Sequence, residues 1–440
     1  MTLLPCGFLG EIILKKSYYN LVQQIENQRV LILNTLTGAS VVMKSEDYAN
    51  LENCEDEELF SACVNNGIIV EKDFDETSFV NFTRYANNLN NPNMHSFVIL
   101  PTTSCNAKCV YCYEEGVTYT TMNLEVAKRT AEYIVSSSGG KDIKLMWFGG
   151  EPLLAVDVID KITEIIVKSL KNEQKFIVSM ISNSSLIDDT IISKMVNEWH
   201  LSRIQITLDG FEEEYNRRKR YIKPVDYKTI LQNINILADC CIQVSIRLNF
   251  DRNNYEEILD LIDYLGDIIT NKEFVSVYAI PLFAPRNCKN RDIYYDEDEL
   301  DEQYFEIYNR LINNNFIRSQ SYFAANLKSH FCGAMKLQHA VINTNGDIYK
   351  CQHINALGNE PVGDIFDGMK LCYNHTKWLN PIIDEKCEKC IYLPSCQGGC
   401  KVAMTENVFQ CCLIKYTPHS SMMAINELYK KTRRITNGKE

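Results

Sequence analysis

Short apolar segments alternate with helix-length amphipathic segments from residue 97 to residue 280, and this alternation limits the possible folds more than any other feature. The segments that read as strands are FVILP (97–101), IKLMWF (143–148), FIVSMI (176–181), RIQITL (203–208), IQVSIRLNF (242–250) and FVSVYAI (274–280). Strand–helix alternation implies a parallel sheet with right-handed crossovers. Because these units are fewer than the eight of a complete barrel, the sequence predicts an α/β fold built on a partial (β/α)6 TIM-like barrel.

A chain of 440 residues is too long for one compact core, so we expect several domains. We assign the barrel to residues 97–310, a cysteine-rich domain to residues 311–425 and a basic tail to residues 426–440. Residues 1–90 read as a small separate module, in which RVLILNTLTGASVVM predicts two strands around a Thr-Gly turn. The polar stretch at residues 83–96 predicts a linker to the barrel.

The charge balance and the apolar runs exclude several classes of partner. Lys and Arg number 45 against 57 Asp and Glu, a net charge of −12, which argues against nucleic acid as the main partner. No uncharged apolar run is long enough to span a bilayer. The N-terminal segment MTLLPCGFLGEIILKK has no basic n-region and is a poor signal peptide. We therefore expect a cytoplasmic protein that binds neither nucleic acid nor membrane.

The chain has 18 cysteines, and in a reducing cytosol so many thiols favour metal ligands over disulfides. A first group is spaced Cys105-x3-Cys109-x2-Cys112. A second group comprises Cys332, Cys351, Cys387, Cys390, Cys396, Cys400, Cys411 and Cys412. The cysteines without ligand spacing are expected to be packed as small apolar residues; they are Cys6, Cys54, Cys63, Cys240, Cys241, Cys288 and Cys372.

The first cysteine group has no obvious fourth member. A structural zinc ion normally takes four protein ligands, whereas a [4Fe–4S] cluster held by three cysteines leaves one iron open for a substrate or cofactor. The group directly follows the first strand, and in a barrel of this kind the active site lies at the C-terminal ends of the strands. The sequence thus predicts chemistry at the first group and closed or electron-handling centres at the second.

The cysteine triple, with Tyr111 before its last member, resembles that of the radical S-adenosylmethionine (SAM) enzymes. The segment Gly149-Gly150-Glu151-Pro152 at the end of the second strand strengthens the resemblance. In that family the segment binds the methionine amino group of the cofactor, and here a carboxylate would meet an ammonium while glycines let the backbone approach. The resemblance implies that SAM is bound by Tyr111, Gly149, Gly150, Glu151, Pro152, Ser182, Asn183, Thr207, Asp209 and Arg247.

The later cysteines resemble the SPASM extension of that superfamily, including the spacing Cys332-x13-Gly346-x4-Cys351. The resemblance implies two auxiliary [4Fe–4S] clusters in addition to the first cluster, three in all. One would be held by Cys332, Cys351 and Cys400. The other would be held by Cys387, Cys390, Cys396 and the last cysteine, for which Cys411 and Cys412 remain alternatives.

Residues 1–90 resemble the winged-helix-like recognition module of peptide-modifying members, which binds a precursor's leader peptide by β-augmentation. The resemblance predicts a maturase that installs a thioether or carbon–carbon crosslink in a ribosomally made precursor peptide. A flavodoxin- or ferredoxin-like protein would donate electrons. A formylglycine-forming sulfatase maturase and a peptide epimerase are alternatives within the superfamily, and a zinc-binding scaffold is the non-enzymatic one. No catalytic residue is assigned, although Asp209 and Glu114 lie on suitable loops.

Overall fold

A computed structural model describes residues 13–89, 94–112, 114, 116–284, 291–323, 326–328, 332–356, 358–379, 385–406 and 411–437. Cys6 and Cys288 lie outside the described residues. No helix of the described chain is long and apolar enough to cross a membrane.

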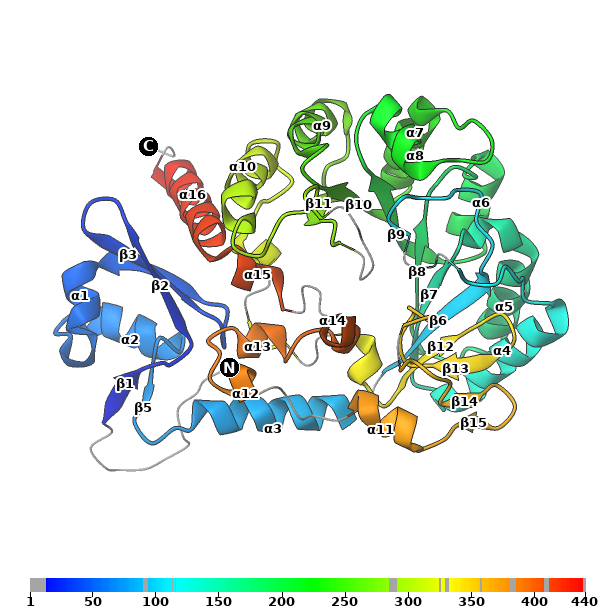
Figure 1. Ribbon diagram of the computed structural model, residues 1–440. Coiled ribbons are helices and arrows are strands. Elements are labelled where there is room, and N and C mark those ends of the chain that lie inside the picture. Colours follow the sequence, from blue (N-terminus) through cyan, green and yellow to red (C-terminus); the bar gives the residue numbers. More distant parts are fainter. Residues whose placement is uncertain are drawn as a thin grey trace.

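The predicted parallel sheet is present, and all of the predicted barrel strands are confirmed (Figure 1). They are β6 (Met94–Thr102), β7 (Asp142–Gly149), β8 (Phe176–Ser182), β9 (Leu201–Leu208), β10 (Gln243–Phe250) and β11 (Val275–Pro281). Each strand pairs in parallel with its neighbours in sequence, so the sheet runs in the order of the chain. Because the outermost strands of this series do not pair with each other, the sheet forms an open partial barrel.

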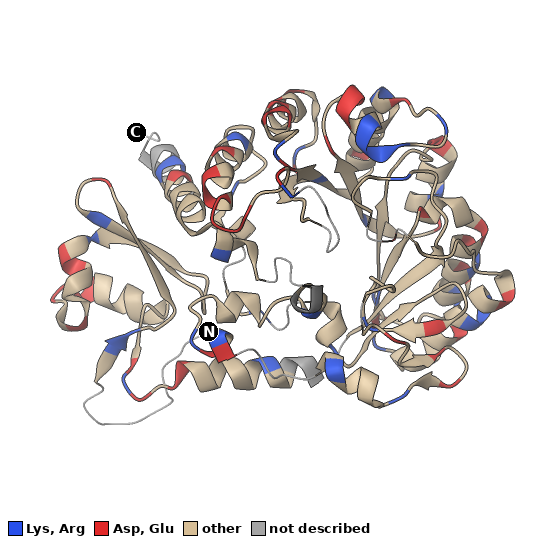
Figure 2. Ribbon diagram, in the orientation of Figure 1, with Lys and Arg blue, Asp and Glu red and all other residues tan. Residues whose placement is uncertain are grey.

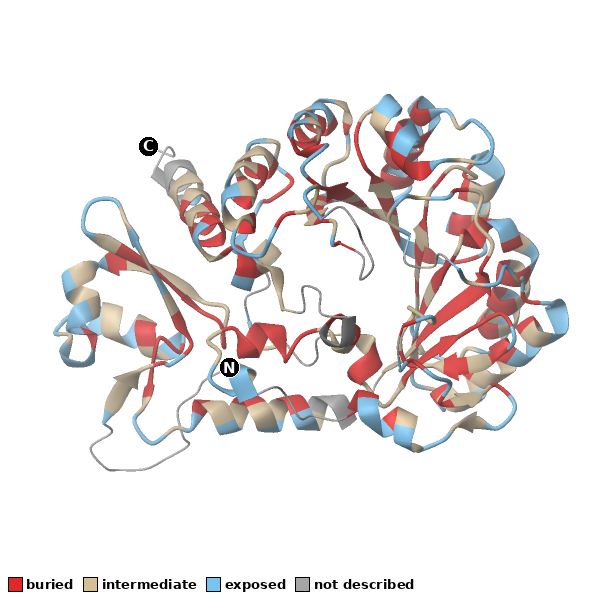
Figure 3. Ribbon diagram, in the orientation of Figure 1, coloured by how far each residue is buried: buried red, intermediate tan, exposed pale blue. Residues whose placement is uncertain are grey.

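Helices follow the strands and cover the outside of the sheet (Figure 1). They are α4 (Leu124–Ser138), α5 (Val156–Ser169), α6 (Asp189–Asn197), α7 (Glu212–Lys219), α8 (Tyr227–Asp239), α9 (Tyr255–Ile268) and α10 (Leu300–Asn313). Side chains of Asn123, Asp188 and Asp226 cap the first turns of α4, α6 and α8. Buried residues lie on the strands and on the inward helix faces (Figure 3), whereas charged residues gather on the outer helix faces (Figure 2).

The sheet continues beyond the predicted end of the barrel at residue 310. Strand β12 (His339–Ile342) pairs in parallel with β6, the strand that the first cysteine group follows. Antiparallel strands β13 (Asp347–Tyr349), β14 (Gly363–Asp364) and β15 (Gly368–Met369) extend this edge. The cysteine-rich region is thus joined to the barrel by main-chain hydrogen bonds.

The cysteine-rich region is otherwise built from short helices. They are η3 (Gln320–Phe323), η4 (Gly333–Met335), α11 (Tyr373–Leu379), α12 (Glu385–Glu388), α13 (Leu393–Cys396), α14 (Lys401–Glu406) and α15 (Leu413–Tyr416). The last helix, α16 (Pro418–Asn437), packs along α10. The predicted start of a basic tail at residue 426 falls inside α16, where Asn426 and Leu428 are buried.

The N-terminal module contains the predicted strand pair, β3 (Arg29–Asn34) and β4 (Ser40–Lys44), joined through Thr37 and Gly38. Strand β2 (Asn20–Ile25) completes an antiparallel sheet, and β1 (Leu14–Lys16) pairs with β5 (Ile69–Glu71). The helices of the module are α1 (Ser45–Ala49), η1 (Leu51–Asn53) and α2 (Glu57–Asn65).

The predicted linker at residues 83–96 is wrong over most of its length. Helix α3 (Glu76–Leu89) occupies its first half, and β6 begins at Met94. The polar composition is misleading because tertiary packing stabilises the helix: Val80 of α3 is fully buried against Leu393 of the cysteine-rich region.

The N-terminal module also shares a core with the cysteine-rich region. Leu31 and Leu33 of β3 pack in one apolar cluster with Tyr392 and Cys396. The Leu327 amide donates to the Leu36 carbonyl at 2.9 Å, and the Thr35 hydroxyl donates to the Ile391 carbonyl at 2.5 Å. The module is therefore not a freestanding unit, since its sheet covers the second cysteine group.

Candidate active site and cysteine centres

The loop after β6 carries Cys105, Cys109 and Cys112, at the C-terminal end of the strand. Burial raises the pKa of all of these thiols, that of Cys105 to about 12. The Asn183 amide nitrogen lies 3.9 Å from the Cys105 sulfur. A metal centre would bind these groups as thiolates, so its binding would release their protons.

The end of α7 holds this loop in place, which the sequence did not indicate. The amides of Lys108 and Val110 donate to the carbonyls of Lys219 and Arg218, both at 3.0 Å. The amide of Ile222 donates to the Asn106 carbonyl at 2.9 Å. The backbone between the cysteines is thus fastened to a segment about a hundred residues further along the chain.

The Gly149-Gly150 pair lies directly against the cysteine loop. A Cβ atom at Gly149, whose φ is 120°, would stand 2.3 Å from the Thr102 carbonyl oxygen, and one at Gly150 would stand 2.1 Å from that of Ser104. The Gly150 amide donates to the Thr102 carbonyl at 3.1 Å. Glycine is required here because any side chain would separate the motif from the loop that carries the thiols.

Glu151 is fully buried, and its carboxylate joins the ends of β7 and β8. It accepts hydrogen bonds from the Ser182 hydroxyl at 2.9 Å and from the main-chain amides of Asn183 at 2.8 Å and Leu153 at 3.1 Å. Burial raises the pKa of Glu151 to about 7 although these donors act to lower it. Glu151 therefore has a structural role within the protein, in addition to the expected contact of its carboxylate with an ammonium group. Pro152 follows as the buried first residue of η2 (Pro152–Ala155).

The raised pKa of Glu151 predicts a pH-dependent stability. The folded chain holds this proton more tightly than the unfolded chain, so stability falls as the pH rises from 4.5 to about 7. We expect a loss of up to about 3 kcal/mol from this group. Urea unfolding of iron-free wild type and Glu151→Gln at about pH 5 and about pH 8 measures it. An equal free-energy difference between the two proteins at both pH values would contradict the assignment.

Asp209, which follows β9 and is fully buried, belongs to a polar network beside the cysteine loop. Its carboxylate accepts from the Tyr111 hydroxyl at 2.5 Å and the Asn249 amide at 3.1 Å, and it pairs with Lys219 at 3.3 Å. The Lys219 ammonium also donates to the Tyr111 hydroxyl at 2.9 Å. Burial, the largest single cause, acts to lower the pKa of Lys219, but Asp209 and the neighbouring groups together outweigh it and the pKa is raised.

The network ties several predicted site residues together and adds one that was missed. Arg247 donates to the Asn249 side chain at 2.8 Å and lies opposite Thr207 across β9 and β10. Lys219 was missed because it lies in the basic run RRKR (217–220), which reads as an exposed helix end. Asp209 is engaged by a cation and hydrogen-bond donors, so its position favours a structural role over that of a general base.

Glu114 lies two residues after Cys112, and one of its carboxylate oxygens is buried without a hydrogen-bond partner. Burial raises the pKa of Glu114 to about 7. Glu114 is therefore better placed than Asp209 to act as a general base.

The later cysteines fall into two neighbouring groups. Cys332, Cys351 and Cys400 pack in one apolar cluster around Trp378 of α11. Cys387 and Cys390 pack against the N-terminal module, and Cys390, Cys396, Cys411 and Cys412 contact the cluster that contains Leu31 and Leu33. Cys396 hydrogen-bonds with both Cys411 and Cys412, so the structure keeps these two as alternatives.

Each of these groups consists of cysteines, the residues that hold four-iron clusters as thiolates. Among the described residues, no three His, Cys, Asp or Glu side chains converge closely enough to hold a metal ion. At the first centre the close approach of Gly149 and Gly150 leaves their backbone beside the thiols, where a cofactor bound to the cluster would lie.

Comparisons with known proteins agree with this geometry. Residues 99–265 match the Radical SAM superfamily. The cysteine-type anaerobic sulfatase-maturating enzyme of Clostridium perfringens strain 13 is 23% identical over 336 residues, covering 70% of this chain and 88% of that protein. The structure of native anSMEcpe with bound AdoMet and Cp18Cys peptide has a TM-score of 0.60 at 20% identity, covering 79% of this chain and 100% of the other. Streptococcus suis SuiB bound to precursor peptide SuiA has a TM-score of 0.53 at 13% identity, covering 91% and 99%.

Proposed function

Because residues 99–265 match the Radical SAM superfamily, we propose that this chain is a radical SAM maturase that crosslinks a ribosomally made peptide. The observation that supports it most is the joining of a three-thiol loop, a Gly-Gly segment and two further thiol centres in one fold. When bound, a reduced cluster and SAM supply a 5′-deoxyadenosyl radical that abstracts a substrate hydrogen atom.

The chain's own residues position the cofactors and exclude water. Cys105, Cys109 and Cys112 would hold the first cluster. The side-chain amide of Asn183 would donate to the Cys105 sulfur. Backbone groups of Gly149 and Gly150 would contact the methionine end of SAM. The hydrogen bonds of Tyr111 to the buried Asp209 and Lys219 would hold the cysteine loop in place.

The later thiol groups suit an oxidative product. Forming a crosslink removes two hydrogens from the peptide: one leaves as an atom to the deoxyadenosyl radical, the other as a proton and an electron. Auxiliary clusters at Cys332, Cys351 and Cys400, and at Cys387, Cys390, Cys396 and Cys411 or Cys412, would accept that electron. A flavodoxin- or ferredoxin-like protein would deliver the electron that cleaves SAM.

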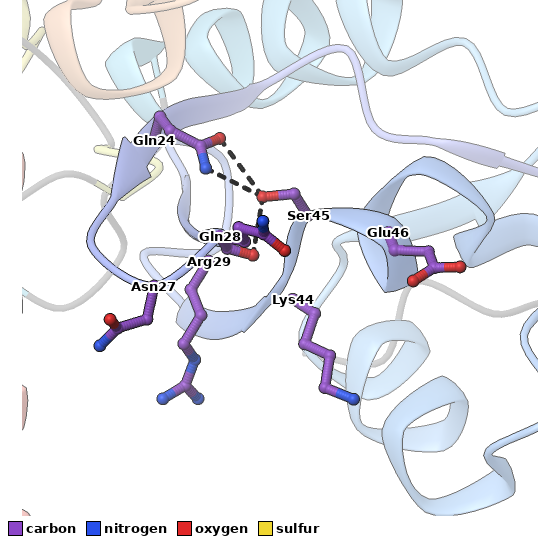
Figure 4. Close-up of a pocket in the computed structure, with 7 residues that line it drawn as sticks. All are labelled: Gln24, Asn27, Gln28, Arg29, Lys44, Ser45 and Glu46. Carbon is purple, nitrogen blue, oxygen red and sulfur yellow. Dashed lines mark hydrogen bonds between the residues drawn. The ribbon is translucent and has the colours of Figure 1, made fainter.

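The N-terminal module offers a surface for the leader of an acidic peptide. A cavity of about 850 Å³ is lined by Arg29, Lys44 and Glu46 together with polar residues of the β2–β3 turn (Figure 4). Arg29 and Lys44 are directly opposite each other on β3 and β4, and neither forms a salt bridge with a described residue. Like charges in this position repel, so an anionic partner would stabilise them.

Charge reversal tests this surface. We expect Arg29→Glu with Lys44→Glu to raise the KM for the precursor by about tenfold or more. The slow cleavage of SAM without peptide should not change, because the cavity does not belong to the cysteine centres. Kinetics with the full precursor and with a leaderless core peptide make the measurement. An unchanged KM for the full precursor would remove this cavity from the recognition surface.

The function itself is tested anaerobically with reconstituted enzyme, SAM, a reductant and the short peptide encoded beside the gene. Formation of 5′-deoxyadenosine together with a peptide lighter by two hydrogens per event supports crosslinking, and fragmentation locates the bond. Absence of deoxyadenosine from an iron-loaded protein would contradict the proposal.

Formylglycine formation is the second candidate, favoured by the sulfatase-maturating relative that the chain matches over 88% of its length. Oxidising a serine to formylglycine also removes two hydrogens, so mass alone does not separate it from a crosslink, whereas oxidising a cysteine also replaces its sulfur by oxygen. A hydrazide reagent does, because it labels the aldehyde of formylglycine and leaves a crosslink unlabelled.

A further inference from the structure

Arg84 of α3 is 3% exposed, and its Nε and Nη1 atoms have no hydrogen-bond partner among the residues that the structure describes. A buried guanidinium without an anion is costly, by several kcal/mol. Five N–H donors and a permanent positive charge make arginine a strong ligand for an anion. The local structure of α3 therefore calls for a negatively charged group beside Arg84.

The direction in which Arg84 faces follows from its helix. Val80 lies one turn earlier on α3 and packs in an apolar cluster that includes Cys387 and Cys390. In Figure 1, α3 runs along α12 and α13, which carry Cys387 and Cys396. Burial lowers the pKa of Arg84, and a thiolate at Cys387 would act to raise it. The guanidinium thus lies near Cys387, a member of the group Cys387, Cys390, Cys396 and Cys411 or Cys412.

A second cation makes this location more demanding. Lys401 is close enough to Arg84 for their charges to repel, and it also lies near Cys332 of the other auxiliary group. Its ammonium donates to the carbonyls of Lys377 and Trp378, at 2.5 and 3.0 Å. Two neighbouring cations in a partly buried region are destabilising unless an anionic centre lies between them.

We propose that Arg84 is a positioning residue of the second auxiliary cluster, the one assigned to Cys387, Cys390, Cys396 and Cys411 or Cys412. Arg84 would hold this cluster by charge and hydrogen bonds and raise its reduction potential. This inference rests on the proposed function in requiring that a cluster be present. A thiolate-bound cluster is anionic, and hydrogen bonds and nearby positive charge favour its more negative, reduced form. Because α3 belongs to the N-terminal segment, this contact would join the peptide-recognition module to the redox machinery.

The test uses the full chain reconstituted with iron and sulfide. Iron and labile sulfide are counted, and the auxiliary midpoint potentials are measured by an EPR-monitored titration in wild type, Arg84→Met and Arg84→Lys. In Arg84→Met we expect a more negative potential for one auxiliary cluster or loss of that cluster. Arg84→Lys should retain the cluster, with a potential between those of the other two proteins.

Two results would overturn the inference: an unchanged potential and iron content in Arg84→Met, or equal loss of the cluster in Arg84→Lys and Arg84→Met, which would reduce Arg84 to a packing role. Tyr85→Phe, an exposed neighbour on α3, serves as the control that leaves the cluster unaltered. Failure of the proposed function looks different, since wild type itself would then contain too little iron for auxiliary clusters.

Discussion

Cys109→Ala should abolish 5′-deoxyadenosine formation while the chain stays folded. Cys109 is a member of the three-thiol set, and three thiolates leave one iron of a four-iron cluster open for SAM. Loss of a direct ligand should reduce activity by more than the roughly 100-fold that removal of an outer-shell partner costs. Iron content, the EPR signal of the SAM-bound cluster and deoxyadenosine yield measure the effect.

Two further variants make the result specific. Asn183→Ala removes the amide that lies 3.9 Å from the Cys105 sulfur and should lower activity by roughly 10- to 100-fold with iron retained. Cys240→Ser alters an exposed thiol at the end of α8 and should have no effect. If Cys109→Ala kept wild-type iron and deoxyadenosine yield, the assignment of this loop to the reactive cluster would be wrong.

Period and composition were sufficient to predict the sheet, because each barrel strand is a short run of β-branched and aromatic residues between amphipathic helices. They were insufficient where a segment's surroundings decide its structure. Residues 83–89 are polar in sequence, yet they continue a helix whose apolar face packs on a region three hundred residues away. No local sequence pattern predicts the contact between α3 and the cysteine-rich region.

The same limit applies to the site. The cysteine spacing and the Gly-Gly segment were readable because both are local and chemically distinctive. Lys219 was not readable, since a basic run at a helix end normally faces solvent. Here α7 is short and turns its last residues inward, so that Arg218 and Lys219 are buried. Arg217 remains exposed, although it pairs with the same Glu214 as Arg218 does. Only the three-dimensional course of the chain separates these neighbours.

Arg218→Met should destabilise the protein by about 3–5 kcal/mol, because it leaves a buried carboxylate without its cation. The guanidinium donates to both oxygens of Asp251 at 2.8 Å and also contacts Glu214. Arg218 is 1% exposed and Asp251 3%, so water does not replace the lost bonds. Urea unfolding of the iron-free chain measures the change in free energy.

Arg217→Met is the matched control, since the adjacent residue pairs with the same Glu214 from the surface. Its side chain is 57% exposed, and its loss should cost only about 0–1 kcal/mol. Arg218→Met should also impair cluster assembly, because the Arg218 carbonyl accepts from the Val110 amide between Cys109 and Cys112. Equal effects of the two variants on stability would show that the buried pair does not anchor α7. A stability loss with normal iron content would show that α7 supports the fold without positioning the cysteine loop.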